Sequence, residues 1–405
     1  MRMYTLSFLL LLITASLVAM PVQEERTTLT VEQQEALFTQ SVQTFSDKLF
    51  FATGSPVHDR MISPLSVLLA LGMTANGAAG QTQEEMLSVL TGSSLSVEDL
   101  NQASLAYLKQ SPKEVSIANS LWANDRMDLS PTFLAKVRKA YRAEARNLNF
   151  QAQKSTKVIN DWVKDATKGA IDSIIDEVQP DMLLYLINAI SFKDAWRSEF
   201  EPRATRTMTF HAQSGDIQIP FLSQQSHFAY LHQNRASYLY LPYKNERYTM
   251  VAILPDQGYG VYSFLEMQKQ AHFSASLFEG FANAEYEFID LSLPKFESRY
   301  ADSLKDELQN LGMRRSFDAG SAEFSAMLAS KKPEAVIDEV LHKTFIRVDE
   351  TGTEAAAVTA VMMKVTSMPP LESLRLVFDR PFVYAILDLE RSIPLFMGVL
   401  DNPKP

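Results

Sequence analysis

Residues 350–360 read Glu-Thr-Gly-Thr-Glu-Ala-Ala-Ala-Val-Thr-Ala. Most side chains in this run are small or compatible with a β-strand, and the run contains no Pro. Ordinary exposed loops are richer in Gly, Pro, Asn and Asp. Because every backbone N–H remains free to pair, the run can become a strand. We therefore expect a loop that can add itself to a sheet.

A strand drawn through this run would have two different faces, because side chains alternate along a strand. One face would carry Thr353, Ala355, Ala357, Thr359, Val361 and Met363. The other face would carry Glu354, Ala356, Val358, Ala360, Met362 and Lys364. Both charges fall on the second face. The first face is therefore suited to burial against packed neighbours, where an unpaired charge would be costly.

Segments on both sides of the run share the pattern of one known family. Residues 340–350 lead into it, and residues 377–386 and 394–398 follow it. Earlier segments fit the same family in the same order: residues 62–66, 71–75, 119–122, 160–163 and 188–196. Together these segments resemble the serpins over essentially the whole mature chain. The run from residue 350 resembles the serpin reactive-centre loop.

The chain is expected to form an α+β fold. Apolar residues follow a helical spacing through most of the first half, starting at residues 31–51, and strand-like runs dominate from residue 183 onward. Helices first and strands later are typical of this class. No linker interrupts residues 21–405, so one domain is expected. The serpin resemblance adds three β-sheets, about nine helices and an exposed reactive-centre loop over about residues 350–376.

Residues 1–20 are expected to be a secretory signal peptide. Arg2 provides the positive start, residues 6–18 are almost entirely apolar, and Ala19 is a small residue near a plausible cleavage point. A retained membrane anchor is the alternative. The apolar run is shorter than the roughly 20 residues that a spanning helix needs, and it ends at Pro21. We expect a secreted, extracellular protein without a membrane anchor.

The composition argues against several other classes of protein. A net charge of −10 does not indicate a nucleic-acid partner. The absence of Cys excludes disulfides, a thiol nucleophile and Cys-ligated metals, and the six His residues show no metal-ligand spacing. The common catalytic motifs G-x-S-x-G and H-E-x-x-H are missing, as is a phosphate-binding Gly loop. We expect no enzyme, no metal site and no cofactor.

The serpin resemblance implies an inhibitor of an extracellular serine protease that acts as a suicide substrate. The protease Ser would attack the loop and form a covalent acyl-enzyme. The cut loop would then insert into the central sheet and trap the complex. A monomer is expected. Two alternatives stay open: a non-inhibitory serpin-fold binding or carrier protein, and a polymer-forming or storage protein that pairs through this β-prone run.

The reactive bond is located by counting along the resemblance. In serpins it usually lies at the seventeenth position when the hinge Glu is the first. Counting from Glu350 gives the bond between Thr366 and Ser367. The chain carries about four extra residues between Pro370 and Phe378, which leaves Lys364 as the alternative.

The same resemblance implies residues that control loop insertion. The hinge residues are Glu350, Gly352, Thr353, Glu354, Ala355, Ala356, Ala357, Val358 and Thr359. The residues expected where the sheet parts, called the shutter and the breach in serpins, are Ser63, Ser66, Asn188, Trp196, Lys295 and His342. Lys295 is the expected partner of Glu350. Asp59 stands where serpins usually have Asn.

A second candidate site is cationic. Lys136, Lys139, Arg142 and Arg146 are expected to share one helix over residues 131–145 or its end. Some serpins bind glycosaminoglycans through a basic helix. The alternative is an ordinary solvated helix face.

Overall fold

The structure is a computed structural model, and it describes residues 29–54, 59–330, 335–353 and 373–403. These residues form nine α-helices and two short 3₁₀ helices, η1 (Pro202–Ala204) and η2 (Arg315–Phe317). The α-helices are α1 (Val31–Ala52), α2 (Pro64–Ala75), α3 (Gly80–Thr91), α4 (Val97–Gln110), α5 (Pro131–Tyr141), α6 (Ser155–Ala166), α7 (Val261–Gln268), α8 (Phe273–Asn283) and α9 (Lys305–Asn310). The α+β class expected from the sequence is confirmed.

The central sheet has seven strands in the described residues. They are β2 (Val115–Asn124), β3 (Glu144–Leu148), β4 (Leu184–Phe192), β5 (Asp194–Ala195), β11 (Phe296–Ser303), β12 (Glu339–Val348) and β13 (Gly352–Thr353). The hydrogen-bonded order is β3-β2-β4-β12-β13-β5, and β11 pairs with the other edge of β12. The two middle strands, β4 and β12, are parallel and pair directly with each other.

The second sheet has nine strands in the described residues. They are β1 (Arg60–Ile62), β6 (Arg206–Ala212), β7 (Gly215–Gln233), β8 (Ala236–Pro242), β9 (Tyr248–Pro255), β10 (Glu285–Pro294), β14 (Leu374–Val377), β15 (Phe382–Asp388) and β16 (Ile393–Leu400). The resemblance implied three sheets. The long β7 pairs with β6 and β10 along most of its length and with β8 at its end, so two of those three count as one hydrogen-bonded sheet.

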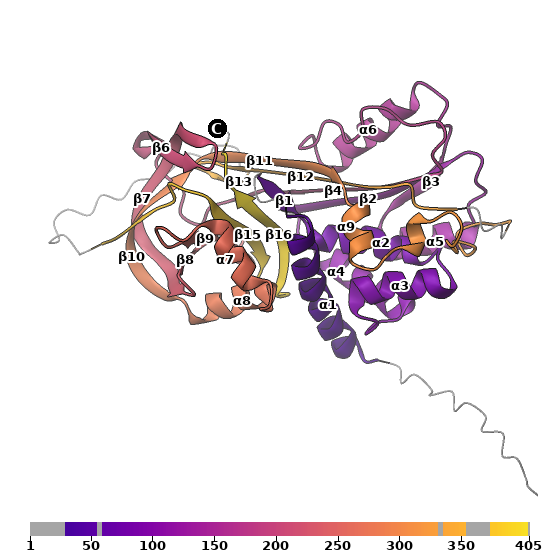
Figure 1. The fold of residues 1–405 in the computed structure, drawn as a ribbon, viewed down its shortest axis with the longest axis horizontal. Helices are drawn as coiled ribbons and strands as arrows, with labels where there is room; N and C mark the ends of the chain where they lie inside the picture. The colour runs from indigo at the N-terminus through magenta and orange to yellow at the C-terminus, as the bar shows by residue number, and fades with distance from the viewer. Residues whose placement is uncertain (1–28, 55–58, 331–334, 354–372, 404–405) are drawn as a thin grey trace, which may run out of the picture.

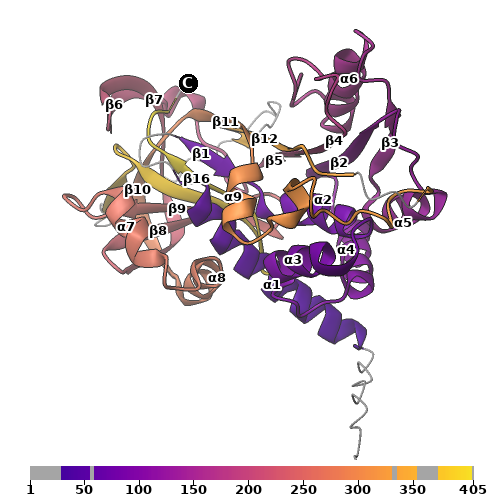
Figure 2. The same cartoon turned by 45° about the vertical axis from the view of Figure 1, so that its right-hand side comes forward.

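Helices cover both faces of the central sheet. Figure 1 and Figure 2 show α6 on one side of β2 and β4, and α2 to α5 on the other. Successive side chains of β4 point alternately toward these two helical layers. Ile187 and Ala189 join the core beneath α6, whereas Leu186 and Ile190 join the main core. A strand buried on both faces explains why residues 184–192 are mostly apolar. The strand also carries the polar residues Asn188 and Ser191, and Asn188 matters below.

Among the helices that the structure describes, none has the length and apolar character needed to cross a membrane. The expected signal peptide, residues 1–20, lies outside the described residues.

Candidate functional site

The first residues of the expected loop are already paired with the central sheet. The chain turns after β12, so that Thr353 faces Val348 in an antiparallel pair. On its other edge, β13 pairs antiparallel with β5, matching Gly352 to Ala195. β5 follows β4 after one residue and continues on the same side of β13. β13 therefore lies at one end of the boundary between β4 and β12. A strand growing from Thr353 between β4 and β12 would continue the same antiparallel pairing.

Gly352 is required by the close approach of two backbones. A Cβ atom at this position would overlap the carbonyl oxygen of Asp194 and lie 2.6 Å from the Cα of Ala195. A larger residue would therefore separate β13 from β5. The turn before it is held by Asp349, whose carboxylate accepts hydrogen bonds from the backbone and hydroxyl of Thr351 at 2.9 and 2.7 Å.

The side chain of Thr353 lies in a closed aromatic pocket. Its Oγ1 is 2.7 Å from the hydroxyl of Tyr243, and both side chains are fully buried. Tyr243 stacks on Trp196 with ring centroids 4.6 Å apart. Trp196 donates from Nε1 to the carbonyl oxygen of Asp349 at 2.9 Å. Burial raises the pKa of Tyr243, so its hydroxyl stays protonated and can donate to Thr353.

Glu350 forms the pairing expected from the sequence. Lys295 Nζ donates to its Oε2 at 2.8 Å, and Thr205 Oγ1 donates to its Oε1 at 2.9 Å. Partial burial opposes ionisation, but the hydrogen bonds from Lys295, the backbone and Thr205 outweigh it and hold the pKa of Glu350 below its usual value. The backbone carbonyl of Glu350 also accepts from Phe200 N at 2.8 Å. Glu350, at the base of the loop, is thus held through both its side chain and its backbone carbonyl.

The remaining loop residues named above lie outside the described residues. These are the hinge residues Glu354, Ala355, Ala356, Ala357, Val358 and Thr359, and the candidate reactive residues Lys364, Thr366 and Ser367.

A buried polar cluster lies in the middle of the β4–β12 ladder. His342 and Asn188 are direct partners in that ladder. Asn188 Oδ1 accepts from Ser66 Oγ at 2.5 Å and faces His342 Nδ1 at 2.7 Å. Asn188 Nδ2 donates to the backbone oxygen of Ser66 at 2.9 Å and to Asn119 Oδ1 at 2.6 Å. All four hydrogen-bonding positions of the buried amide are therefore used.

His342 is held in one neutral tautomer. The backbone N–H of Ser63 donates to Nε2 at 3.0 Å, which makes Nε2 the acceptor. Nδ1 then carries the proton and donates to Asn188 Oδ1. Complete burial lowers the pKa of His342 to about 3.

Two members of the cluster differ from the expectation. Ser63 contributes its backbone N–H, while its buried hydroxyl has no hydrogen-bond partner in the described part of the chain. Asn119, which the residue-by-residue prediction missed, completes the amide network from β2. The signal in the sequence that could have identified Asn119 was a polar residue within a buried strand. Asp59 lies elsewhere and accepts from the backbone N–H of Asp401 and Asn402 at 2.5 and 2.8 Å.

The prediction of one basic helix is wrong. Lys136 and Lys139 are exposed on α5, but this helix ends at Tyr141. Arg142 follows as the C-cap in a left-handed conformation with φ of 51°. Arg146 lies on β3, where it stacks over Trp122 at 4.8 Å and pairs with Glu144 at 3.4 Å. The four cations therefore do not share one helix face.

The chain is similar to known proteins along almost its entire length. The family model described as serpin (serine protease inhibitor) matches residues 40–403. An uncharacterized serpin-like protein of Thermococcus kodakarensis is 33% identical over 92% of this chain and 87% of its own length. Human serpin B8 is 31% identical over 89% of this chain and 98% of its own length.

Solved structures add a comparison of conformations. The native structure of tengpin, a thermophilic serpin, is 33% identical, covers 93% of this chain and 95% of its own, and gives a TM-score of 0.82. Its latent structure covers 93% of this chain and 99% of its own, and gives a lower TM-score of 0.76. The structure of human thyroxine-binding globulin in complex with thyroxine has a TM-score of 0.81 at 24% identity and covers 92% of this chain and 100% of its own. At this identity the similarity supports the fold alone.

By TM-score, this structure is more similar to the native structure of tengpin than to its latent structure. With a family model matched over most of its length and relatives more than 30% identical, the chain belongs to the serpin family.

Proposed function

We propose that this serpin is a secreted inhibitor of an extracellular serine protease and that it acts as a suicide substrate. The protease Ser attacks the bond between Thr366 and Ser367 and forms an acyl-enzyme. The severed loop then inserts between β4 and β12, starting at Thr353, before the ester is hydrolysed. The chain itself performs no catalysis in this scheme. It supplies the loop that the protease cleaves and the sheet into which that loop inserts.

The observation that carries this proposal is the position of Gly352 and Thr353. They already pair antiparallel with β12, and on the other edge with β5, the short strand that follows β4. The side chain of Thr353 lies in the closed aromatic pocket and bonds the Tyr243 hydroxyl, so the first inward position of the loop is accommodated. The uncharged inward face from Thr353 to Met363 supports the same sequence of events.

The middle of the sheet also supports insertion. Seven pairs hold β4 and β12 together, from Tyr185 with Glu339 to Ser191 with Phe345. All seven must separate for a strand to enter, and each strand would regain partners from the new one. The cluster of His342 and Asn188 stands at the centre of this ladder, so it sets part of the barrier to opening.

The test is a denaturing gel of the purified protein mixed with trypsin, chymotrypsin or elastase. Formation of a complex that survives denaturation, with loss of protease activity, supports the proposal. Cleavage at Thr366 would release residues 367–405. Sequencing the released N-terminus distinguishes this bond from one after Lys364. Complete cleavage by all three proteases with no stable complex and full remaining activity would instead favour a non-inhibitory binding protein.

A further inference from the structure

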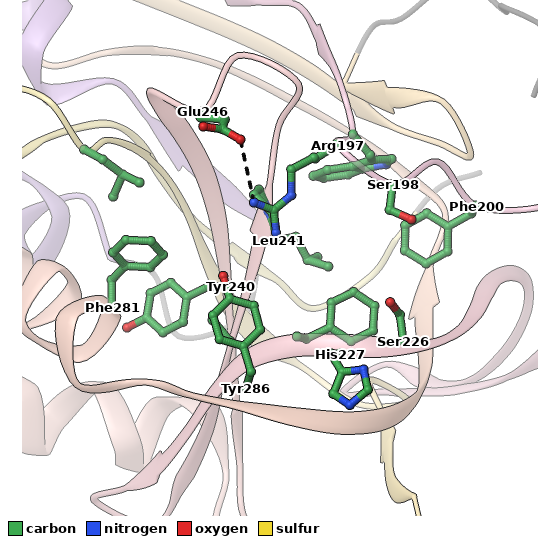
Figure 3. Close-up of a pocket in the computed structure, with 15 residues that line it drawn as sticks. Arg197, Ser198, Phe200, Ser226, His227, Tyr240, Leu241, Glu246, Phe281 and Tyr286 are labelled. Atoms are coloured by element: carbon green, nitrogen blue, oxygen red, sulfur yellow. Dashed lines mark ion pairs between the residues drawn. The ribbon is translucent and has the colours of Figure 1, made fainter. Parts of the chain in front are cut away.

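A cavity of about 320 Å³ lies beside the breach, lined mainly by strands of the second sheet and by the segment that follows β5. Figure 3 shows its lining, which comes from the segment after β5, from β7, β8 and β10, and from α8. Its volume is at the lower end of the roughly 300–1,000 Å³ that small-molecule sites occupy. Nothing in the proposed inhibitory mechanism uses this space.

The floor of the cavity is apolar and rich in aromatic rings. Trp196, Phe228 and Tyr240 are almost completely buried. Phe281 of α8 packs against Tyr240 with ring centroids 5.3 Å apart. The hydroxyl of Tyr240 is already occupied, because it donates to the carbonyl oxygen of Leu277 at 3.0 Å. The floor therefore offers ring faces and no free polar group from Tyr240, which suits a flat hydrophobic ligand.

One cation faces this floor. In Figure 3 the guanidinium of Arg197 lies between Glu246 and the aromatic side chains. The Arg197–Glu246 ion pair spans 3.9 Å, and these side chains are 47% and 79% exposed. Among the described residues the guanidinium forms no hydrogen bond and no other ion pair. An exposed pair at this distance contributes little, so the guanidinium can bind a ligand anion instead.

The rim carries a second unexplained feature. Tyr286 on β10 is 61% exposed, which makes it one of the few large hydrophobic side chains on the surface of the described residues. It stands at the edge of the cavity opposite Ala229 in the β7–β10 ladder. A ring system that entered the cavity would be covered by Tyr286, which would then lose most of its contact with water.

We propose that this cavity binds a planar aromatic anion, with its rings against Trp196, Phe228, Tyr240, Phe281 and Tyr286 and its carboxylate or sulfonate on Arg197. The aromatic floor supplies most of the affinity, and the guanidinium selects the acid over a neutral analogue. The site is separate from the loop and does not depend on protease inhibition.

The position of Trp196 connects such a ligand to the hinge. Trp196 belongs to the cavity floor, stacks on Tyr243 and donates to the carbonyl oxygen of Asp349. Tyr243 in turn contacts Thr353. A ligand that packs on Trp196 would therefore contact a residue that also supports the seated hinge.

Fluorescence titration of the full chain with 8-anilinonaphthalene-1-sulfonate tests the site. The uncharged N-phenyl-1-naphthylamine has the same rings and serves as the comparison probe. We expect one saturable site for both probes. Arg197→Gln should weaken binding of the sulfonate about tenfold or more and leave the neutral probe almost unchanged. Arg203→Gln removes an equal charge from an exposed position outside the cavity and should bind both probes like the unmodified chain.

Tyr286→Ser should weaken both probes, whereas Leu374→Ser, which removes another exposed apolar side chain, should weaken neither. Circular dichroism checks that each variant is folded. The proposal is overturned if binding does not saturate, or if Arg197→Gln and Arg203→Gln bind the sulfonate equally. If Arg197→Gln does not fold, equal binding by Tyr286→Ser and Leu374→Ser overturns it, and selective weakening by Tyr286→Ser supports it.

Discussion

His342 donates its Nδ1 proton to Asn188 across the parallel ladder that joins β12 to β4, at 2.7 Å. The bond lies at the fourth of the seven pairs that must separate to admit a strand. Neither residue contacts solvent appreciably, since their side chains are 1% and 0% exposed. A buried network of this kind is most stable when every member is satisfied, so it favours the closed sheet.

The neutral state of His342 makes stability depend on pH. Its pKa is lowered to about 3 in the folded protein from an ordinary value of 6.5. The unfolded chain therefore binds a proton between these values that the folded protein does not, and stability falls as pH falls through this window. Urea unfolding at pH 7, 6 and 5 should show a loss of up to about 1.4 kcal/mol per pH unit below 6.5 from this residue.

The matched variants are His342→Gln and His232→Gln. The first replaces the buried imidazole with a group that does not titrate, so the slope of stability between pH 6.5 and 5 should flatten. The second removes an exposed imidazole that pairs with Asp256 and should leave the steep slope in place. Equal slopes in the unmodified chain and His342→Gln would contradict the assignment of this pH dependence to His342.

Replacing Thr353 by Arg should convert the inhibitor into a substrate. Burying an unpaired guanidinium in the Tyr243 pocket costs about 3 kcal/mol or more, which is about a hundredfold in any competition between insertion and hydrolysis. The measurement is the ratio of covalent complex to cleaved serpin on a denaturing gel. Thr132→Arg, at an exposed position on α5, is the control and should keep the original ratio. An unchanged ratio in Thr353→Arg would argue against insertion through this pocket.

The hydrogen bond between Tyr243 and Thr353 can be measured by a double-mutant cycle. Tyr243→Phe or Thr353→Val alone leaves one buried hydroxyl without its partner, and each should lower the free energy of unfolding by about 1–3 kcal/mol. The double variant removes both hydroxyls and should recover about 1 kcal/mol of the summed loss. Strict additivity in urea unfolding would mean that the two side chains are not coupled.

The buried Arg247–Asp388 ion pair should be much more costly to break than an exposed ion pair. Arg247 bonds both carboxylate oxygens, at 2.9 and 2.6 Å, and the side chain of Asp388 is fully buried. Asp388→Ala leaves a nearly buried guanidinium without its main partner and should cost about 3 kcal/mol or more. Asp161→Ala breaks the exposed pair with Lys157 and should cost about 0.5 kcal/mol or less. Thermal unfolding compares the two variants directly, and similar melting temperatures would contradict this ranking.

The part of the hinge that the structure describes, and much of the shutter, could be predicted from the sequence because their residues lie in recognisable segments. The pairing of Glu350 with Lys295 and the grouping of Ser66, Asn188 and His342 follow from such segments. Tyr243 could not be predicted as the partner of Thr353. The two residues are 110 positions apart, and no local pattern distinguishes this Tyr from the other buried aromatic residues of the second sheet.

The error at the basic helix has a local cause. Residues 132–146 have helical spacing and contain no Gly or Pro. The sequence therefore gives no sign that α5 ends at Tyr141. Arg142 takes a left-handed conformation that costs an ordinary residue about 1 kcal/mol. Pairing of β3 with β2 from Glu144 onward compensates for this strain. Tertiary pairing of this kind overrides local propensity.

The seating of Gly352 and Thr353 has a kinetic consequence for the proposed inhibitor. In ordered polymers the slow event is usually the formation of the first turn or rung, after which growth is fast. Here that first rung exists before any protease arrives, and it fixes both the register and the direction of everything that follows. Once the loop is cut, it has no entry point to find, so its race against hydrolysis depends on how fast β4 and β12 separate and the loop pairs between them.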